Sequence, residues 1–333
     1  MANTLSDYSK LALDAMVKGI IDTIIYESPL YDKLPFTEIT GNSLLYNLES
    51  GLAGADWYAV GDVWKESTPD WAQRSVALTI LGGDADVDNF ARQTRANVQD
   101  LEAAIIEKKA KAISYEFQKQ LIHGQTYGYL GNEMTGLMRH LAYCETATTT
   151  DLDALNNSQV VNCAAAGALD TPVSLSLLKL MELIDAIKPG KPDYLVMSRA
   201  MGRKLFDIAR AGGANLTFNT DPNRVGMMIE LFNGIPILIN DWIPDNMEHT
   251  TSSVLELVSS AWYGVDANSV ASPVFAIKLG EFNLCGIQNA GIQTERLGNL
   301  ETKDAQRTRI KWYCGLANFA KLDIAVLVNA KPV

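Results

Sequence analysis

Hydrophobic residues recur at three- and four-residue steps in four segments, a pattern typical of amphipathic helices. The segments are residues 6–25, 95–123, 172–187 and 199–213. The second contains no Gly or Pro and ends at Gly124, a residue type that commonly caps a helix C-terminus. A helix over this segment would be about 40 Å long, which exceeds the diameter of a small domain. We therefore expect a spine to which other elements attach, and not one member of a helical bundle.

The third helix is predicted to begin at Thr171 and Pro172 and to stop before Pro189, because proline suits a first helical turn and cannot continue a helix. Its predicted buried face consists of Leu175, Leu178, Leu180, Leu183, Ile184 and Ile187. The fourth helix is predicted to end at Gly212 and Gly213.

Strands are predicted where apolar and polar residues alternate. Residues 44–48 and 76–80 alternate in this way and can pair, although the segment between them is too long for a tight turn. Four apolar runs predict further strands: YLVMS, GIPILINDWIP broken by Pro236 and Pro244, VLELVSSAWYGVD, and SPVFAIKLG. These runs alternate with two of the helices, which favours an α+β unit. The apolar end of the chain, TRIKWYCGLANFAKLDIAVLVNA, predicts one strand or a pair of strands that partners the spine.

The segment between the two alternating strands, residues 50–71, is rich in aromatic, glycine and acidic residues. Its aromatic residues are Trp57, Tyr58, Trp64 and Trp71. A loop of this length is normally functional or disordered, and its aromatic content argues against disorder. We expect it to be ordered by packing on something beyond its own hairpin. A neighbouring subunit is the favoured surface, and a substrate lid is the alternative.

Composition describes a folded protein with room for two packed units: 333 residues, of which 47% are hydrophobic and 20% charged. The net charge of −11 would repel a phosphate backbone, so sequence-specific nucleic-acid binding is not expected. Four cysteines lie far apart without a C-x-x-C pair, which favours reduced thiols. Charged residues interrupt every apolar run long enough to cross a membrane, so we expect a protein of an aqueous compartment.

Catalytic patterns are weak. The three histidines, His123, His140 and His249, are scattered, and no nucleophile elbow or phosphate-binding glycine loop is present. His140 and Cys144 make at most half of a metal site. We therefore expect no catalytic residues, no cofactor and no metal. The run of Asp84, Asp86 and Asp88 is expected to be a solvated strand end, with a cation site as the alternative.

Lys65 and Glu66 lie in the aromatic loop, while Asn318 and Asn329 lie near the end of the chain. Together these residues would allow a Lys–Asn isopeptide cross-link between subunits. Ordinary surface charge and polar strand ends explain them equally well.

The order of these elements resembles one family, the major capsid proteins of tailed bacteriophages with the Hong Kong 97 fold. The resemblance rests on SPLYDKLPFTEITGNSLLYN before the aromatic loop, RANVQDLEAAIIEKKAKAISYEFQKQLIHG, YLVMSRAMGRKLFDIARAGG, LFNGIPILINDWIP and RTRIKWYCGLANFAKLDIAVLVNA. The resemblance covers essentially the whole chain and depends on the order of these segments, since none of them is diagnostic alone. The chain departs from the commonest pattern because it has no long charged N-terminal scaffolding region.

The resemblance implies an α+β fold in five regions. These are an N-terminal arm (1–42), an extended β-hairpin loop (43–82), a peripheral domain with the spine helix (83–172), an axial domain (173–297) and a return to the peripheral domain (298–333). Contacts between subunits are expected at Trp57, Tyr58, Trp64, Lys65, Glu66, Trp71, Gly212 and Gly213.

The implied function is structural: copies of the chain form hexamers and pentamers that close into an icosahedral shell around the double-stranded DNA of a tailed phage. Implied partners are a portal protein and separate scaffolding or decoration proteins, and DNA is enclosed without sequence-specific binding. Assembly in the host cytoplasm and a place in the virion follow from the same resemblance.

Two alternatives stay open. Encapsulins, bacterial compartments that hold a cargo enzyme, are similar in fold, and a helix over residues 6–25 would suit a cargo groove. A hydrolase with a tryptophan-lined lid is the alternative from a different class.

Overall fold

The computed structural model describes residues 29–51, 54–68, 70–90, 101–124, 132–145, 159–164, 171–211, 217–220, 228–243, 245 and 270–332. Several predictions lie outside the described residues: the helix over 6–25, the strand VLELVSSAWYGVD, the break at Pro244, and the roles of Gly212, Gly213 and His249.

Helices and strands are mixed along the chain. In chain order they are α2 (Pro29–Lys33), β1 (Phe36–Glu38), β2 (Ser43–Gly51), β3 (Asp70–Ala77), β4 (Thr79–Asp88), α4 (Leu101–His123), α5 (Leu137–Glu145), β5 (Val160–Asn162), β6 (Val173–Ser174), α6 (Leu177–Asp185), β7 (Tyr194–Met197), α7 (Arg199–Ala211), β8 (Thr217–Thr220), β9 (Met228–Phe232), β10 (Ile235–Ile239), β11 (Val274–Ile277), β12 (Leu284–Asn299), β13 (Ala305–Asn318), β14 (Ile324–Val328) and β15 (Ala330–Lys331). The predicted strands YLVMS and SPVFAIKLG and the predicted helix beginning at Arg199 are confirmed.

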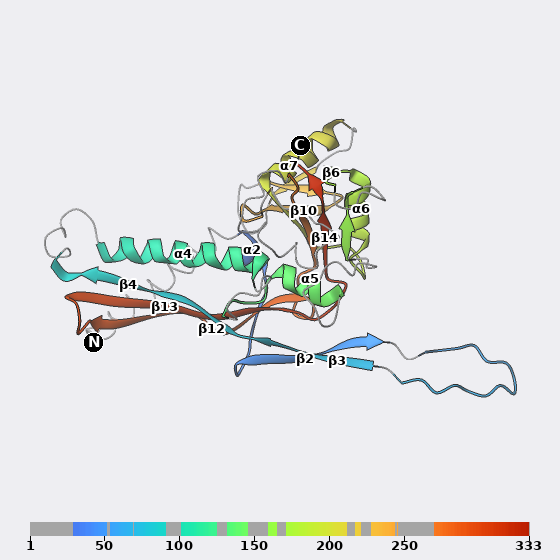
Figure 1. Ribbon diagram of the computed structural model, residues 1–333, viewed down its shortest axis with the longest axis horizontal. Coiled ribbons are helices and arrows are strands. Elements are labelled where there is room, and N and C mark those ends of the chain that lie inside the picture. The colour runs from blue at the N-terminus through green and yellow to red at the C-terminus, as the bar shows by residue number, and fades with distance from the viewer. Residues whose placement is uncertain are drawn as a thin grey trace, which may run out of the picture.

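Two sheets organise these elements. One has four strands in the order β1-β12-β13-β4, and the other has seven in the order β5-β14-β11-β7-β10-β9-β8. Figure 1 shows α4 running alongside β4 and β13 on one side of the molecule, while the separate pair β2–β3 extends in the opposite direction from α4, below the seven-stranded lobe. The molecule therefore combines a lobe with two long projections.

Helices cover both faces of the seven-stranded sheet, because its central strands are apolar on both sides. Leu195, Val274 and Leu327 contribute to a core shared with α6 and α7. Their neighbours Val196 and Phe275 point to the opposite face and join a core shared with α4 and α5. This alternation is the two-residue period of a strand.

The spine prediction is confirmed for α4, which ends at His123 as expected. The predicted first residues, 95–100, lie outside the described part of the chain. Phe117 of α4 packs on Trp312 of β13 with ring centroids 4.8 Å apart, and both side chains are fully buried. The predicted partnership between the spine and the end of the chain is therefore confirmed. That end forms two strands, β13 and β14, in different sheets.

The hairpin prediction is also confirmed: β2 and β3 are antiparallel, with Leu44 opposite Val76. The prediction that residues 76–80 form one strand is wrong. β3 ends at Ala77, and Ile80 belongs to β4, which pairs with β13. The alternation does not mark one face through the break, because Val76 is buried whereas Ile80 is 75% exposed on β4.

Two details of the third helix and of β10 differ from the sequence predictions. Helix α6 begins at Leu177 because β6, just before it, pairs with β15 and keeps the chain extended. Leu178, predicted to be buried, is 68% exposed. Pro236 does not break its strand: it lies in β10 opposite Leu231, near the strand's start, where a missing N–H is tolerated.

The division into five regions stays a prediction, and the sheets cross two of its limits. β12 lies within the predicted axial domain but pairs with β13 in the four-stranded sheet. β14 lies in the predicted return segment but pairs with β11 and β5 in the seven-stranded sheet.

Candidate assembly surface

The loop that joins β2 to β3 is described over residues 54–68 and turns at its tip between Ala59 and Asp62. The Asp62 N–H donates to the Ala59 carbonyl at 3.2 Å, and the Ala59 N–H donates to Asp62 Oδ2 at 2.7 Å. Gly61 occupies the left-handed region with φ of +98°, which a side chain would disfavour. The tip is therefore a β-turn defined by its own residues.

Contacts between the two sides of this loop continue away from the tip. The rings of Tyr58 and Trp64 stack with centroids 4.5 Å apart and an angle of 24° between their planes. The Lys65 N–H donates to Tyr58 Oη at 3.1 Å, and Ser67 Oγ donates to the Gly54 carbonyl at 2.9 Å. The expectation that the loop has little to pack on within its own hairpin is wrong, because its two sides contact each other.

These internal contacts leave the apolar side chains of the loop in solvent. Trp57 is fully exposed, Trp64 is 79% exposed, and Val60 and Val63 are also exposed. A cluster of large apolar side chains on a protruding loop is typical of a binding surface. Lys65 and Asp56 form an ion pair at 3.7 Å that is too exposed to add much stability.

The structure brings five of the predicted contact residues together in this loop: Trp57, Tyr58, Trp64, Lys65 and Glu66. Trp71 lies in β3 opposite Glu49, and its side chain is outside the described part of the structure. The sequence analysis did not identify Val60 and Val63 as exposed residues of this loop. Their position on either side of Gly61, a residue type common in turns, could have indicated it. The role of these residues in contacts between subunits stays a prediction.

A small core fixes the root of the hairpin to the four-stranded sheet. It joins Val76 of β3 to Ile287 of β12 and Ala317 of β13. Tyr46 of β2 packs on Phe319 with ring centroids 4.9 Å apart. The root is therefore anchored while the loop at the other end projects into solvent (Figure 1).

The three aspartates of β4 lie beside two arginines of β13. Arg307 binds Asp86 and Arg309 binds Asp84, each through two hydrogen bonds of 2.6–2.9 Å. The bonds from Arg309 hold the pKa of Asp84 below its ordinary value. Asp84 and Asp86 are therefore part of a cross-strand ion-pair ladder at a solvent-accessible strand end. The expectation of a solvated strand end is confirmed, and the arginines disfavour a cation site there.

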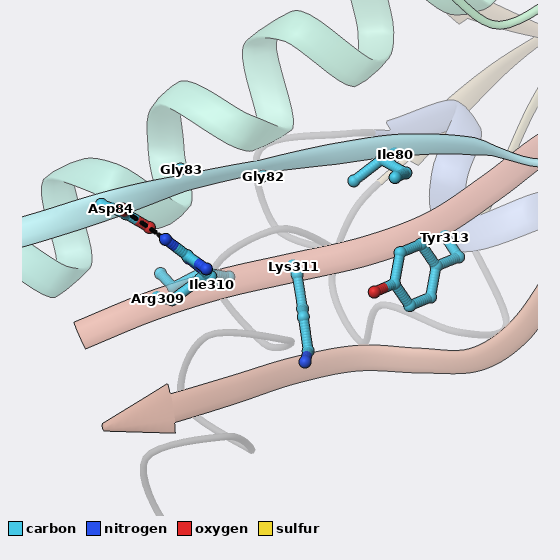
Figure 2. A pocket seen from close by; sticks show the side chains of 8 residues that line it. All are labelled: Ile80, Gly82, Gly83, Asp84, Arg309, Ile310, Lys311 and Tyr313. Carbon is cyan, nitrogen blue, oxygen red and sulfur yellow. Dashed lines mark hydrogen bonds and ion pairs between the residues drawn. The ribbon is translucent and has the colours of Figure 1, made fainter. Parts of the chain in front are cut away.

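Figure 2 shows Arg309 and Asp84 pointing toward each other across the two strands, while Lys311 and Tyr313 project from the same strand as Arg309. These side chains border a shallow depression of about 550 Å³, together with Ile80, Gly82, Gly83 and Ile310. Charges of both signs lie side by side here, and the two basic residues, Arg309 and Lys311, outnumber Asp84.

Three other residues considered for chemistry, His140, Asn318 and Asn329, are buried. His140 Nε2–H donates to the Leu316 carbonyl at 2.8 Å, and burial lowers the pKa of this imidazole to about 4. Asn318 and Asn329 are 5% and 1% exposed, so a lysine of another subunit cannot reach them without rearrangement. The cross-link considered from the sequence is therefore disfavoured.

Three of the four cysteines, Cys163, Cys285 and Cys314, are free and buried, which confirms the expectation of reduced thiols for these positions. Burial raises the pKa of Cys314 to about 12. The side chain of Cys144 is outside the described part of the structure.

Within the residues that the structure describes, no three His, Cys, Asp or Glu side chains gather as a metal site would require. No helix in the same part of the chain has the length and apolarity needed to cross a membrane.

Comparison with known proteins finds relatives only among solved structures: no protein-family model and no curated protein matches the sequence. The capsid of cyanophage A-1(L) superposes with a TM-score of 0.65 at 10% identity, over 91% of this chain and 93% of that one. The SrpI encapsulin complex of Synechococcus elongatus PCC 7942 gives 0.63 at 13% identity, over 91% and 88%. The capsid of a native GTA particle gives 0.58 at 14% identity, over 90% and 89%. The chain therefore has the α+β capsid fold of the Hong Kong 97 type, as its sequence predicts.

Proposed function

We propose that this chain is the major capsid protein of a tailed phage, a structural subunit whose copies close into an icosahedral shell around double-stranded DNA. The observation that carries the proposal is the fold, which matches shell subunits over about nine-tenths of the chain. Proteins of several phages are among the matches, including Mycobacterium phage Bobi at a TM-score of 0.56.

The loop of residues 54–68 supports assembly independently of these comparisons. Trp57 and Trp64 are exposed on a loop that has its own turn and cross-contacts, so their exposure is not a result of an unfolded segment. Exposed tryptophans on an ordered projection are costly in a protein that stays monomeric, because they invite association. Burial against a neighbouring subunit removes this cost.

The proposal includes hexamers and pentamers of the chain as building units, and a portal and separate scaffolding or decoration proteins as partners. The net charge of −11 suits a container, because a shell that bound its DNA tightly would hinder packaging and release. The proposal assigns no catalytic activity, and places assembly in the host cytoplasm.

An encapsulin-like shell is the second candidate, and the match to the SrpI encapsulin complex favours it specifically. The fold of the SrpI encapsulin is as similar to this chain as the folds of the phage capsids are. The two candidates differ in the contents of the particle.

The contents of particles isolated from the cells that naturally make the protein test this proposal. We expect double-stranded DNA that resists nuclease until the particles are opened. Particles without DNA that instead contain a second protein in fixed proportion to the shell would contradict the phage assignment and support the encapsulin candidate.

A further inference from the structure

We propose that the exposed side of α7 in one copy of this chain binds the exposed side of α6 in a second copy. This inference rests on the proposed function, because it identifies a contact through which shell subunits recognise each other.

The exposed side of α7 is a basic stripe with an aromatic residue in it. Arg199, Arg203, Phe206 and Arg210 follow each other at steps of four, three and four residues, so they share one side of the helix. The other side is buried on the seven-stranded sheet through Met201, Leu205 and Ala209. Phe206 is 41% exposed, although a ring of this size is normally buried.

Most of the charge in this stripe is available for a partner. Arg199 binds Asp241 at 3.2 Å in an exposed ion pair. Neither Arg203 nor Arg210 has an ion-pair partner within the described ranges. Two unpaired guanidinium groups therefore flank Phe206, in a chain whose net charge is strongly negative.

A depression of about 390 Å³ lies beside the stripe. Its lining consists of Arg199, Gly202, Arg203, Phe206 and Ile239. Gly202 contributes no side chain, and Ile239 and Phe206 supply apolar walls. The depression therefore suits an apolar side chain that enters between two arginines.

The exposed side of α6 has the opposite character. Leu178 is 68% exposed and Met181 is 42% exposed, and Glu182 and Asp185 lie on the same side of the helix. Lys179 holds Glu182 at 2.7 Å, while Asp185 has no ion-pair partner in the part of the chain that is described. This surface therefore combines two unburied apolar side chains with carboxylates.

The two stripes have opposite charge and similar length. Arg203 and Arg210 are separated by two helical turns, about 10 Å along the axis, and the stripe from Leu178 to Asp185 has the same length. The carboxylates of Glu182 and Asp185 lie within one end of that stripe. A helix-to-helix contact would bury Leu178 and Met181 against Phe206 and the depression, with the carboxylates beside the arginines. Desolvated opposite charges around an apolar centre are typical of energetically important interface residues.

Contact between these stripes requires two copies of the chain. α6 and α7 cover the same face of the seven-stranded sheet, and both stripes point away from it, so they cannot face each other within one subunit. Figure 1 shows α6 along one side of the lobe and α7 toward the end farthest from β2 and β3. Because each copy would offer one stripe and retain the other, the contact is head-to-tail, which forms a ring where the rotation between copies closes.

Charge reversal tests the inference. We expect Arg203→Glu and Asp185→Arg to lower the yield of sedimenting particles by about tenfold each, because each places like charges across the contact. Equal amounts of the two variants, mixed as unassembled subunits, should restore six-membered rings at nearly the wild-type yield, since every contact in an alternating hexamer then pairs opposite charges. A five-membered ring keeps one mismatched contact, so closed particles should recover only in part. Such recovery on mixing requires that the contact joins different copies.

Lys321→Glu and Glu301→Arg are matched controls, because they make the same charge changes at exposed positions outside both helices. Circular dichroism checks that each variant folds. If Arg203→Glu or Asp185→Arg does not fold, Arg210→Glu and Glu182→Arg replace them as the test pair. Reversals that assemble as well as the controls, or folded variants whose mixing restores nothing, would overturn this inference alone. A folded wild-type chain that never assembles, even together with the other proteins of the cells that naturally make it, would overturn the proposed function and this inference with it.

Discussion

At the scale of single residues, two buried ionisable groups make stability depend on pH in opposite directions. His140 is buried and hydrogen-bonded to the carbonyl of Leu316. Asp323, directly before β14, is 1% exposed. Burial lowers the pKa of His140 to about 4 and raises the pKa of Asp323 to about 6. In both cases the folded subunit disfavours the charged form.

Acid should destabilise the subunit through His140. Because its folded pKa of about 4 lies below the ordinary 6.5, the unfolded chain binds the extra proton between these values, and stability falls as pH drops through that window. His140→Gln keeps an N–H donor for Leu316 but does not titrate. Urea unfolding of unassembled subunits at pH 7 and pH 4 should show wild type losing about 3 kcal/mol more than this variant. Equal losses of unfolding free energy in wild type and variant would contradict the assignment of this acid sensitivity to His140.

Asp323 should act in the reverse sense. Its raised pKa means that the folded state binds the extra proton between pH 4 and 6, so ionisation above pH 6 costs folding free energy. Asp323→Asn should therefore stabilise unassembled subunits by about 2 kcal/mol at pH 8 and have little effect at pH 4. Glu301→Gln, an exposed carboxyl change, should have little effect at either pH. Destabilisation of the Asp323 variant at pH 8 would contradict this account.

At the scale of elements, the loop of residues 54–68 separates folding from assembly. Trp57 is fully exposed and contributes no burial within its own subunit. Trp57→Ala should therefore leave the melting temperature of the subunit nearly unchanged while lowering particle yield by about tenfold, as expected for an interface hot spot. Trp64→Ala should lower assembly as well, with a small additional loss of loop order because the stack on Tyr58 is removed.

Phe282→Ala is the matched control for these changes, because Phe282 is an aromatic residue that is 83% exposed in a different loop. It should leave both melting temperature and particle yield unchanged. An equal loss of helicity and of assembly in the Trp57 variant would show instead that this side chain supports the subunit fold.

Local signals in the sequence were enough to predict the longer described helices and the most apolar strands, but not α5, β12 or the short strands β5, β6, β8 and β9. The end of α4 at His123 follows from apolar spacing and the adjacent Gly124, and the pairing of Leu44 with Val76 follows from alternation. The exposure of Leu178 was not predictable from spacing, because an apolar stripe looks the same whether a core or another subunit covers it. The order of the seven-stranded sheet depends on pairings between distant segments, which periodicity does not report.

At the scale of the whole molecule, exposed apolar side chains gather on different parts of the described chain. The loop of residues 54–68 projects away from the lobe, and the stripes of α6 and α7 lie on the lobe itself (Figure 1). Sequence reasoning found the loop from its composition. It did not find the stripes, because their residues look like the ordinary polar side of an amphipathic helix until the exposure of Phe206, Leu178 and Met181 is seen. A subunit with several such surfaces is suited to a closed assembly.

Electron microscopy of the purified protein, with light scattering on the same fractions to give mass, tests the central claim most directly. The account predicts closed shells, tubes or rings of hexamers and pentamers, with masses that are large multiples of the 36.4 kDa chain. A folded protein that stays monomeric at all salt and protein concentrations, including in extracts of the cells that naturally make it, would contradict it.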